Sequence, residues 1–201
     1  MFGLIFFVCL TVFLISRLNE ILGVHMGFKA EIKRGPFEEE NEIEEVDSSA
    51  NDLQKKIDLI SKNYSKFDVN DFIEKAKKVF EIVFSAYAGD DKKTLHGLLG
   101  KRMYDAFSMA IDDRKSRHEK LEGILVRFIS ADIVDAKIEG DDIFVDVKFA
   151  TEQSNVLKNI DGKILEGNSD YVEVRTDVWT FSRKKSSSDP RWLLYEIKNQ
   201  E

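Results

Sequence analysis

The sequence predicts an α+β domain that follows an N-terminal membrane anchor. The chain opens with a long apolar run that contains no charged residue. Apolar residues then recur at helical spacing as far as residue 116, and they alternate as in β-strands from residue 121 onward. Because the helices precede the strands, we expect helices packed on one face of a curved antiparallel sheet of about four strands.

Length, charge and cysteine content narrow the class of protein. A chain of 201 residues suits one domain with appendages. Its net charge of -7 argues against nucleic-acid binding, which needs a clustered basic face. Cys9 is the single cysteine, so the sequence permits neither an intrachain disulfide nor a cysteine-rich metal site.

The apolar run Phe2–Ile15 is short for a membrane span on its own. At about 1.5 Å per residue it covers roughly 21 Å of a hydrocarbon layer of ~30 Å, and Leu18, Ile21 and Leu22 extend it. No basic residue precedes the run and no small-residue cleavage site follows it closely. We therefore expect an uncleaved transmembrane anchor at residues 1–22; a signal peptide and a helix buried in the domain are the alternatives.

Basic residues after the anchor predict its orientation. Arg17, Lys29, Lys33 and Arg34 all lie on its C-terminal side. Lysine and arginine near the ends of a membrane span stay on the cytoplasmic side. The N-terminus is therefore expected outside and the domain in the cytoplasm, or on the matrix side of an organelle.

Residues 23–51 have the composition of a linker. Gly35-Pro36 is followed by a run of acidic residues between Glu38 and Asp47, and then by two serines. Like charges with few apolar residues favour a disordered, extended tether. An acidic docking tail is the alternative function of this segment.

The domain, residues 52–201, begins with a helical half. Helices are expected over residues 52–63, 68–88, 91–99 and 103–116. Asp68 is a suitable N-cap for the second helix, and Gly89 is a suitable residue to end it. The apolar stripe of that helix, which includes Phe72, Phe80 and Val83, is typical of a helix that covers a sheet.

The second half reads as consecutive strands joined by turns. In the extended run over residues 121–137, Ile124, Val126 and Phe128 alternate. In the next strand, Phe149 shares a face with three aliphatic residues, whereas Phe144 stands among polar residues on the other face. Residues 172–183 and 189–197 form a closing hairpin that carries both tryptophans.

Aromatic residues of the helical stripe and the strands are candidates for an apolar binding pocket. One layer of helices covers only one side of a sheet, and the other side must curl, meet a partner or expose apolar surface. The rings either line a cavity for an apolar chain segment or acyl tail, or they fill the core. The candidate residues are Phe80, Phe84, Tyr87, Phe144, Trp179, Phe181 and Trp192.

The sequence contains no recognisable catalytic or metal-binding motif. His25, His96 and His118 are isolated from one another, and the aspartates between residues 132 and 146 lack the spacing of a calcium loop. We therefore expect no cofactor and no enzyme activity. A general acid–base pair assembled from distant strands is the alternative.

Three segments resemble the Tim44-like family, and specifically its bacterial membrane-anchored members. They are Phe13–Gly23 with Gly27-Phe28, Phe72–Tyr104, and Val178–Arg183 with Ser188–Leu194. The resemblance implies a cystatin-like or nuclear-transport-factor-two-like domain with a large apolar pocket. The mitochondrial relatives tether a heat-shock chaperone to the import channel at the matrix face of the inner membrane, and contact precursors and cardiolipin.

The resemblance therefore implies an inner-membrane-anchored, non-enzymatic domain that assists protein translocation, insertion or assembly. Its implied partners are membrane or precursor proteins, a chaperone, and anionic lipid such as cardiolipin. The sequence departs from the mitochondrial relatives, because it lacks their long charged segment for chaperone and channel contacts and carries an apolar run of its own. An enzyme of the same fold class and a structural role in a larger assembly are the alternative functions.

Overall fold

The structure, a computed structural model, describes residues 39–64, 67–168 and 171–199, with side chains described from residue 51 onward. It divides into two compact units, residues 1–46 and 47–201. The second unit holds the α+β domain. The expected anchor at residues 1–22 lies outside the described residues, as does the first part of the expected linker.

The helical half contains four helices in the described part of the chain: α2 (Glu39–Asn63), α3 (Val69–Ala88), α4 (Lys92–Leu98) and α5 (Lys101–Ser116). All four expected helices are present, but α2 begins well before residue 52. The helix α2 thus includes part of the acidic run that the sequence assigned to an extended tether. Glutamate is a good helix former, and acidic residues near a helix N-terminus interact favourably with its dipole.

Both ends of α3 lie where the sequence predicted them, although Gly89 is not the left-handed residue. The Asp68 carboxylate accepts a hydrogen bond from the Asp71 backbone N–H at 2.8 Å, which confirms the predicted N-cap. Gly89 is the C-cap, with φ of −84°, and the left-handed residue is Asp90 with φ of 58°. Aspartate adopts this region more readily than most residues, so glycine was not required there.

The sheet is antiparallel throughout and has the order β1-β2-β4-β5. Its main strands are β1 (Lys120–Glu139), β2 (Asp142–Lys158), β4 (Glu173–Lys184) and β5 (Leu193–Asn199). A short strand, β3 (Ile164–Gly167), pairs with β2 beside them. The structure thus confirms the predicted α+β class and adds β3 to the four expected strands.

Three bulges bend β1 and shift its alternation. The register against β2 slips between Leu125 and Arg127, between Phe128 and Ser130, and between Ile133 and Asp135. Each bulge inserts a residue, so the core-facing positions are not evenly spaced. Phe128 packs against the core, whereas Ile124 and Val126 are exposed. The predicted common face of Ile124, Val126 and Phe128 is therefore wrong.

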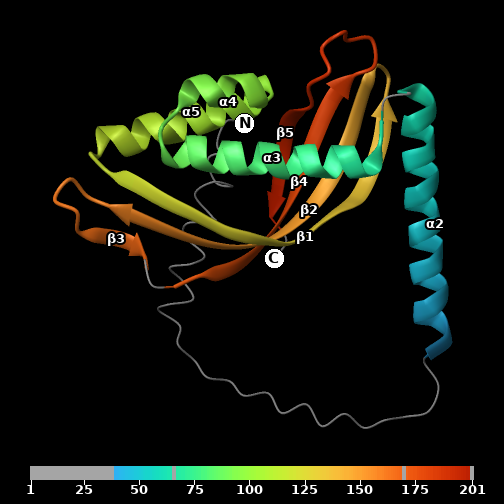
Figure 1. The fold of residues 1–201 in the computed structure, drawn as a ribbon, viewed down its shortest axis with the longest axis horizontal. Coiled ribbons are helices and arrows are strands. Elements are labelled where there is room, and N and C mark those ends of the chain that lie inside the picture. Colours follow the sequence, from blue (N-terminus) through green and yellow to red (C-terminus); the bar gives the residue numbers. More distant parts are fainter. Residues whose placement is uncertain (1–38, 65–66, 169–170, 200–201) are drawn as a thin grey trace, which may run out of the picture. The chain divides into compact units, whose positions relative to one another are not determined.

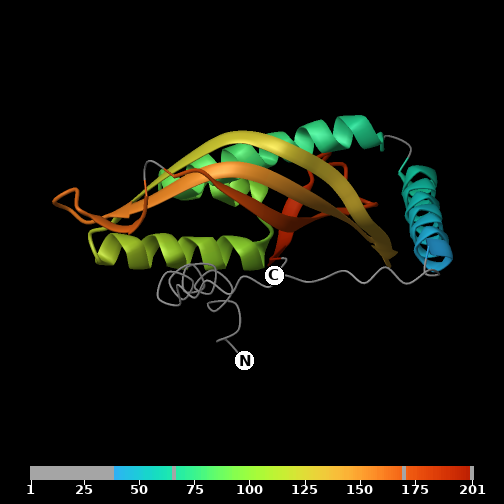
Figure 2. The same cartoon turned by 90° about the horizontal axis from the view of Figure 1, so that it is seen from below.

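The helices pack on the concave side of the curved sheet, called the inner face below. Figures 1 and 2 show the long strands β1 and β2 bowed, with α3 lying across the bow. Core side chains come from alternate positions of β2, including Val145, Val147 and Phe149, and from Trp179 and Phe181 of β4. The opposite side of the sheet, which carries Phe144, is called the outer face.

A buried ion pair joins the end of α3 to α5. Arg114 of α5 is 4% exposed and forms an ion pair with Asp90. Its guanidinium also donates to the Tyr87 backbone carbonyl at 2.6 Å and lies 4.7 Å from the centroid of the Tyr87 ring. Because a buried charge without a partner is costly, this pair fixes the turn after α3 against α5.

Candidate functional site

The inner face of the sheet is filled by packed aromatic rings. Phe80 of α3 lies 4.4 Å from Trp179 of β4 and 5.0 Å from Phe149 of β2, measured between ring centroids. Phe181 lies 5.8 Å from Phe72. Phe80, Phe149, Trp179 and Phe181 are each at most 6% exposed. These rings are in contact with one another, so the centre of the inner face contains core side chains.

Two more of the pocket candidates lie at the ends of this cluster. Phe84 stacks on Phe80 at 6.3 Å, and Trp192 meets the ring of Phe72 edge-on at 5.0 Å. Tyr87 packs against Phe107 at 5.0 Å, beside the Arg114 ion pair. All three are partly buried against the core.

Phe144 lies apart from the other candidates. Its ring packs against Tyr195 at 5.1 Å, and the Lys137 ammonium lies 5.2 Å from its centroid. These contacts are on the outer face, because Phe144 alternates with the core residues Ile143 and Val145. Phe144 therefore lies on the opposite side of the sheet from Trp179, and its part in a binding pocket stays a prediction.

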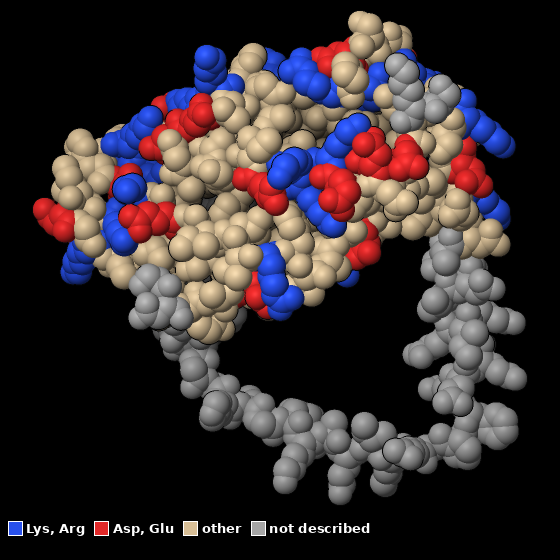
Figure 3. All heavy atoms as spheres, in the orientation of Figure 1, with Lys and Arg blue, Asp and Glu red and all other residues tan. Residues whose placement is uncertain are grey.

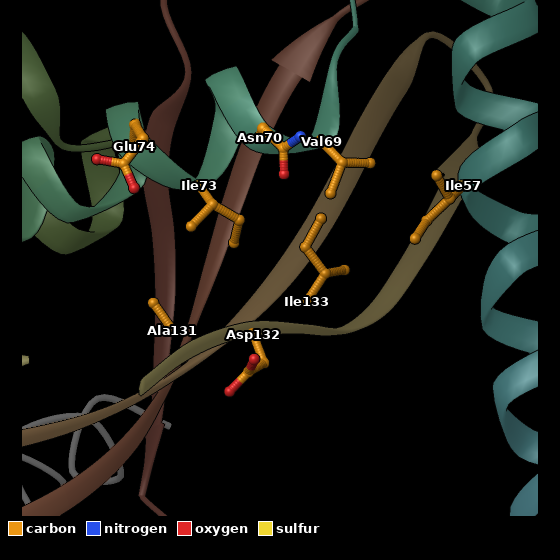
Figure 4. Close-up of a pocket in the computed structure, with 8 residues that line it drawn as sticks. All are labelled: Ile57, Val69, Asn70, Ile73, Glu74, Ala131, Asp132 and Ile133. Carbon is orange, nitrogen blue, oxygen red and sulfur yellow. The ribbon is translucent and has the colours of Figure 1, made fainter. Parts of the chain in front are cut away.

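A cavity does exist at the edge of the domain, between α2, α3 and β1 (Figure 4). Its volume is about 380 Å³, and Ile57, Ile73 and Ile133 contribute one side chain from each of the three elements. The remaining lining residues are Val69, Asn70, Glu74, Ala131 and Asp132. None of the seven candidate rings lines this cavity, so a ligand-binding role for those rings stays a prediction.

A second cavity extends the first along the same edge. It has a volume of about 330 Å³ and lies between Phe128 of β1 and the charged residues of α3. Glu74 lines both cavities. Together they form a groove between β1 and α3, called the β1–α3 groove below. Figure 4 shows the apolar end of the groove, at Ile57 and Ile133. There the side chains of Ile73 and Ile133 point toward one another.

No direct signal in the sequence indicates this groove. Ile57 and Ile73 belong to ordinary helical stripes, and their side chains project from different elements. Ile133 reaches the inner face because two bulges precede it in β1. A bulge inserts one unpaired residue, and its position cannot be recognised from the hydrophobic pattern of the sequence. The groove could be found only once the register of β1 was known.

Next to the aromatic rings, the inner face carries a row of polar side chains on β2 and β4. Thr151 and Gln153 of β2 are 1% and 6% exposed, and the Thr151 hydroxyl has no hydrogen-bond partner among the described residues. Arg175 and Asp177 stand beside them on β4. Burial raises the pKa of the Asp177 carboxyl, although the nearby Arg175 guanidinium acts in the opposite direction.

The structure shows no further candidate for chemistry in the residues that it describes. His96 packs edge-on against Tyr104 at 4.9 Å, and His118 is the left-handed residue just after α5. His25 lies outside the described residues. Between residues 39 and 199, apart from the undescribed gaps, no group of three or more metal-ligating side chains is present.

Charges on the domain surface are mixed rather than segregated. Figure 3 shows lysine and arginine interspersed with aspartate and glutamate over the visible face. Several of them form exposed ion pairs, such as Lys75 with Asp71 and Arg127 with Glu152. No helix in the described part of the chain is long and apolar enough to cross a membrane.

The fold and its filled inner face define an α+β domain without an evident catalytic centre in the described residues. A family model for the Tim44-like domain matches residues 53–199. The chain therefore belongs to the Tim44-like family, as its motifs suggested.

Two curated relatives are similar over most of the chain. One is the probable mitochondrial import inner membrane translocase subunit tin-44 of Caenorhabditis elegans, 22% identical over 163 residues that cover 79% of this chain and 38% of the relative. The other is an uncharacterized protein of Rickettsia prowazekii (strain Madrid E), 25% identical over 152 residues that cover 76% and 62%. The chain thus spans less than two thirds of each relative.

A solved structure, the intermembrane-space region of the chloroplast protein ARC6, also matches. The identity is 17%, the match covers 67% of this chain and 97% of that one, and the TM-score is 0.47. A likeness at that level supports no conclusion about function.

Substitution of Trp179 measures how firmly the inner face is packed. Because Trp179 is buried against Phe80 and Phe149, Trp179→Ala should lower the free energy of unfolding by roughly 3–5 kcal/mol. Urea denaturation of the domain would measure it. Tyr171→Ala, at a tyrosine that is 65% exposed, is the control and should change stability by about 0.5 kcal/mol or less. Equal effects would show that Trp179 borders open space.

Asp177→Asn should make the domain more stable at neutral pH. The pKa of Asp177 is raised in the folded state, so the folded protein binds this proton more tightly than the unfolded chain does. The resulting stabilisation is present below the unfolded pKa of about 3.9 and is lost as pH rises through the folded pKa. Denaturation midpoints of wild type and Asp177→Asn should diverge as pH rises from 3 to 7. Parallel curves would contradict the raised pKa.

Proposed function

We propose that the protein is a membrane-anchored, non-enzymatic interaction domain that assists the translocation, insertion or assembly of other proteins at an inner membrane. The observation that carries the proposal is membership of the Tim44-like family over residues 53–199. The name of the Caenorhabditis elegans relative, a probable import translocase subunit of the inner membrane, supports the same role.

Membrane attachment is proposed to come from Phe2–Leu22, with the N-terminus outside and the domain in the cytoplasm of a bacterium, or on the matrix side if the protein is mitochondrial. The uncharged apolar run and the basic residues after it support this arrangement. The proposed partners are membrane or precursor proteins, with a chaperone and an anionic lipid such as cardiolipin as further candidates. The predicted aromatic pocket would take an apolar segment of such a partner only if its packed rings move apart.

Strand β1 offers a second apolar surface for these contacts. Val126, Ile129 and Val134 lie at the three bulges of β1 and are 50%, 46% and 41% exposed. Ile124, on the same strand, is 62% exposed. A row of exposed aliphatic residues on one strand is more than the isolated exposed residues that most proteins carry. The row therefore supports a domain that contacts other proteins.

Site-specific photocrosslinking in membranes tests the proposal. A photoreactive amino acid at Val126 should capture membrane or secretory proteins, because this position lies in the exposed apolar row. The same amino acid at Lys148, near the middle of the outer face, is the control. Mass spectrometry of the adducts would identify the partners. Recovery from Val126 of only the proteins that Lys148 also captures would contradict the proposed function.

A small-molecule or lipid-processing enzyme is the second candidate, and Asp177 is the observation that favours it. A carboxyl group with a raised pKa beside a buried polar row is typical of a general acid or base. A substrate would have to reach Asp177 past Arg175 and Glu173, which form an ion pair at 3.1 Å. Turnover that is lost in Asp177→Asn would establish this function in place of the first.

A further inference from the structure

The outer edge of β1 is an open edge of the sheet. The sheet order places β1 at one edge and β5 at the other. The β5 edge is partly covered, because the Gly100 backbone N–H donates to the Leu194 carbonyl at 2.8 Å. No backbone hydrogen bond joins the outer edge of β1 to another segment in the described ranges. An unpaired edge is a template for a further strand.

This edge strand is long and carries exposed aliphatic side chains. It runs for 20 residues. Ile124, Val126, Ile129 and Val134 are between 41% and 62% exposed. Because edge strands that stay unpaired are mostly short or protected, a long edge with exposed apolar side chains is expected to have a partner. The charges of β1 indicate which partner fits.

The charges of β1 are complementary to the same strand running in the opposite direction. Two copies of β1 can be placed antiparallel about a two-fold axis that passes between Ile129 and Ser130. The charged residues that then face one another are Lys120 with Glu139, Glu122 with Lys137, and Arg127 with Asp132. Each pair joins opposite charges, and the symmetry forms each pair twice. Opposite charges that face one another across two strands stabilise the pairing.

Residues that face one another in this register lie on the same side of the sheet. All six charged residues pair with even-numbered positions of β2, as does Lys137 with Phe144, so they lie on the outer face. Figure 4 accordingly shows Asp132 pointing away from α3. The facing pairs on the inner face are Leu121 with Ile138, Gly123 with Ala136, and Phe128 with Ala131. The two sheets can therefore join without a change of face.

Neighbouring registers lose this complementarity. If the axis moves one residue toward the N-terminus, Lys120 faces Lys137 and Glu122 faces Asp135. If it moves one residue the other way, Glu122 faces Glu139. Like charges directly opposite each other destabilise a pair of strands. The charges of β1 therefore favour one register for pairing with a second copy.

The bulges of β1 agree with the same axis. Bulges usually protect an edge, because they bend the strand and interrupt its regular hydrogen bonding. The residues that β2 leaves unpaired are Val126, Ile129 and Val134. Val126 and Val134 lie at nearly equal separations in sequence on the two sides of the axis, and Ile129 lies beside it. In the two copies the bends therefore fall close to one another.

Helix α2 contacts β1 at one end of this stretch. Lys56 forms an ion pair with Asp135 at 3.1 Å, and the two side chains are 42% and 46% exposed. In the described ranges α2 makes no backbone hydrogen bond to β1. A second copy would displace the Lys56 side chain, and an ion pair this exposed contributes little to stability.

We propose that two copies of the chain pair through β1, antiparallel about an axis between Ile129 and Ser130, and that their sheets join into one. Each exposed aliphatic residue of β1 gains a neighbour from the second copy. The pairing does not rest on the proposed function. Because it uses the exposed row of β1, pairing and the binding of other proteins through that row exclude one another.

Disulfide trapping in the full-length protein tests the register. In a Cys9→Ser background, the double variant Arg127→Cys/Asp132→Cys should form covalent dimers on mild oxidation, because facing Cα atoms lie about 4.5–5.5 Å apart. The two cysteines of one copy cannot join, since the extended strand separates them by roughly 17 Å. Each single variant is a control and should give only background dimer, because its two cysteines are offset along the paired strands.

Charge reversal tests the same contact without engineered cysteines. Arg127→Glu places a glutamate opposite Asp132 at two symmetric positions and should weaken the dimer about tenfold. Arg127→Glu/Asp132→Arg restores opposite charges and should restore the dimer. Arg102→Glu makes the same charge change at an exposed residue of α5 and should have no effect. Analytical ultracentrifugation of the full-length protein in detergent measures the dissociation constant.

Each outcome decides the proposal. Covalent dimers from the double cysteine variant alone, with recovery of the dimer on double charge reversal, support it. A protein that stays monomeric, equal dimer yields from single and double cysteine variants, or a dimer that Arg127→Glu leaves unchanged would each overturn it. Capture of other proteins at membranes is read separately by photocrosslinking at Val126, so failure of this proposal and failure of the proposed function are distinguishable.

Discussion

The contact between Phe80 of α3 and Trp179 of β4 holds the helical layer on the sheet. Their ring centroids are 4.4 Å apart, and Phe149 packs against both rings. Aromatic side chains bury large apolar areas and pair in preferred geometries, so one cluster of this kind contributes much of the core. With the centre of the inner face filled, the β1–α3 groove and the exposed aliphatic residues of β1 are among the open apolar surfaces of the described structure.

The bulges of β1 determine where those open surfaces lie. Each inserted residue bends the strand and changes which neighbour faces the core. Phe128 and Ile133 reach the inner face as a result, and Val126, Ile129 and Val134 stand exposed. The curvature that lets α3 lie across the sheet and the exposed apolar row of β1 therefore have the same cause.

Most of the fold could be predicted from the sequence because its elements carry strong periodic signals. The stripe of α3, the N-cap at Asp68 and the alternation of β2 each specify a local structure, and the structure contains all three. The bulges could not be predicted, since period two shows neither the position nor the number of inserted residues. The helical start of α2 was missed because a run of glutamates is typical of both linkers and helix N-termini.

The candidate site was harder to predict than the fold. Phe80, Trp179 and Phe181 lie together in the core, and the sequence grouped them only as candidates for a pocket. It could not show whether packed rings leave a cavity, which depends on how closely the helix approaches the sheet. Phe144 was grouped with them by residue type, although its alternation with Ile143 and Val145 already placed it on the other face.

The rings of the inner face pack against one another as a core. Fluorescence quenching by a brominated fatty acid tests this packing most directly. A Trp192→Phe variant leaves Trp179 as the only tryptophan, and bromine quenches it on close contact. Because Trp179 is enclosed by Phe80, Phe149 and Phe181, we expect its emission to stay constant as the brominated fatty acid is added. A saturable loss of Trp179 emission would show an acyl chain inside the domain and would contradict the account.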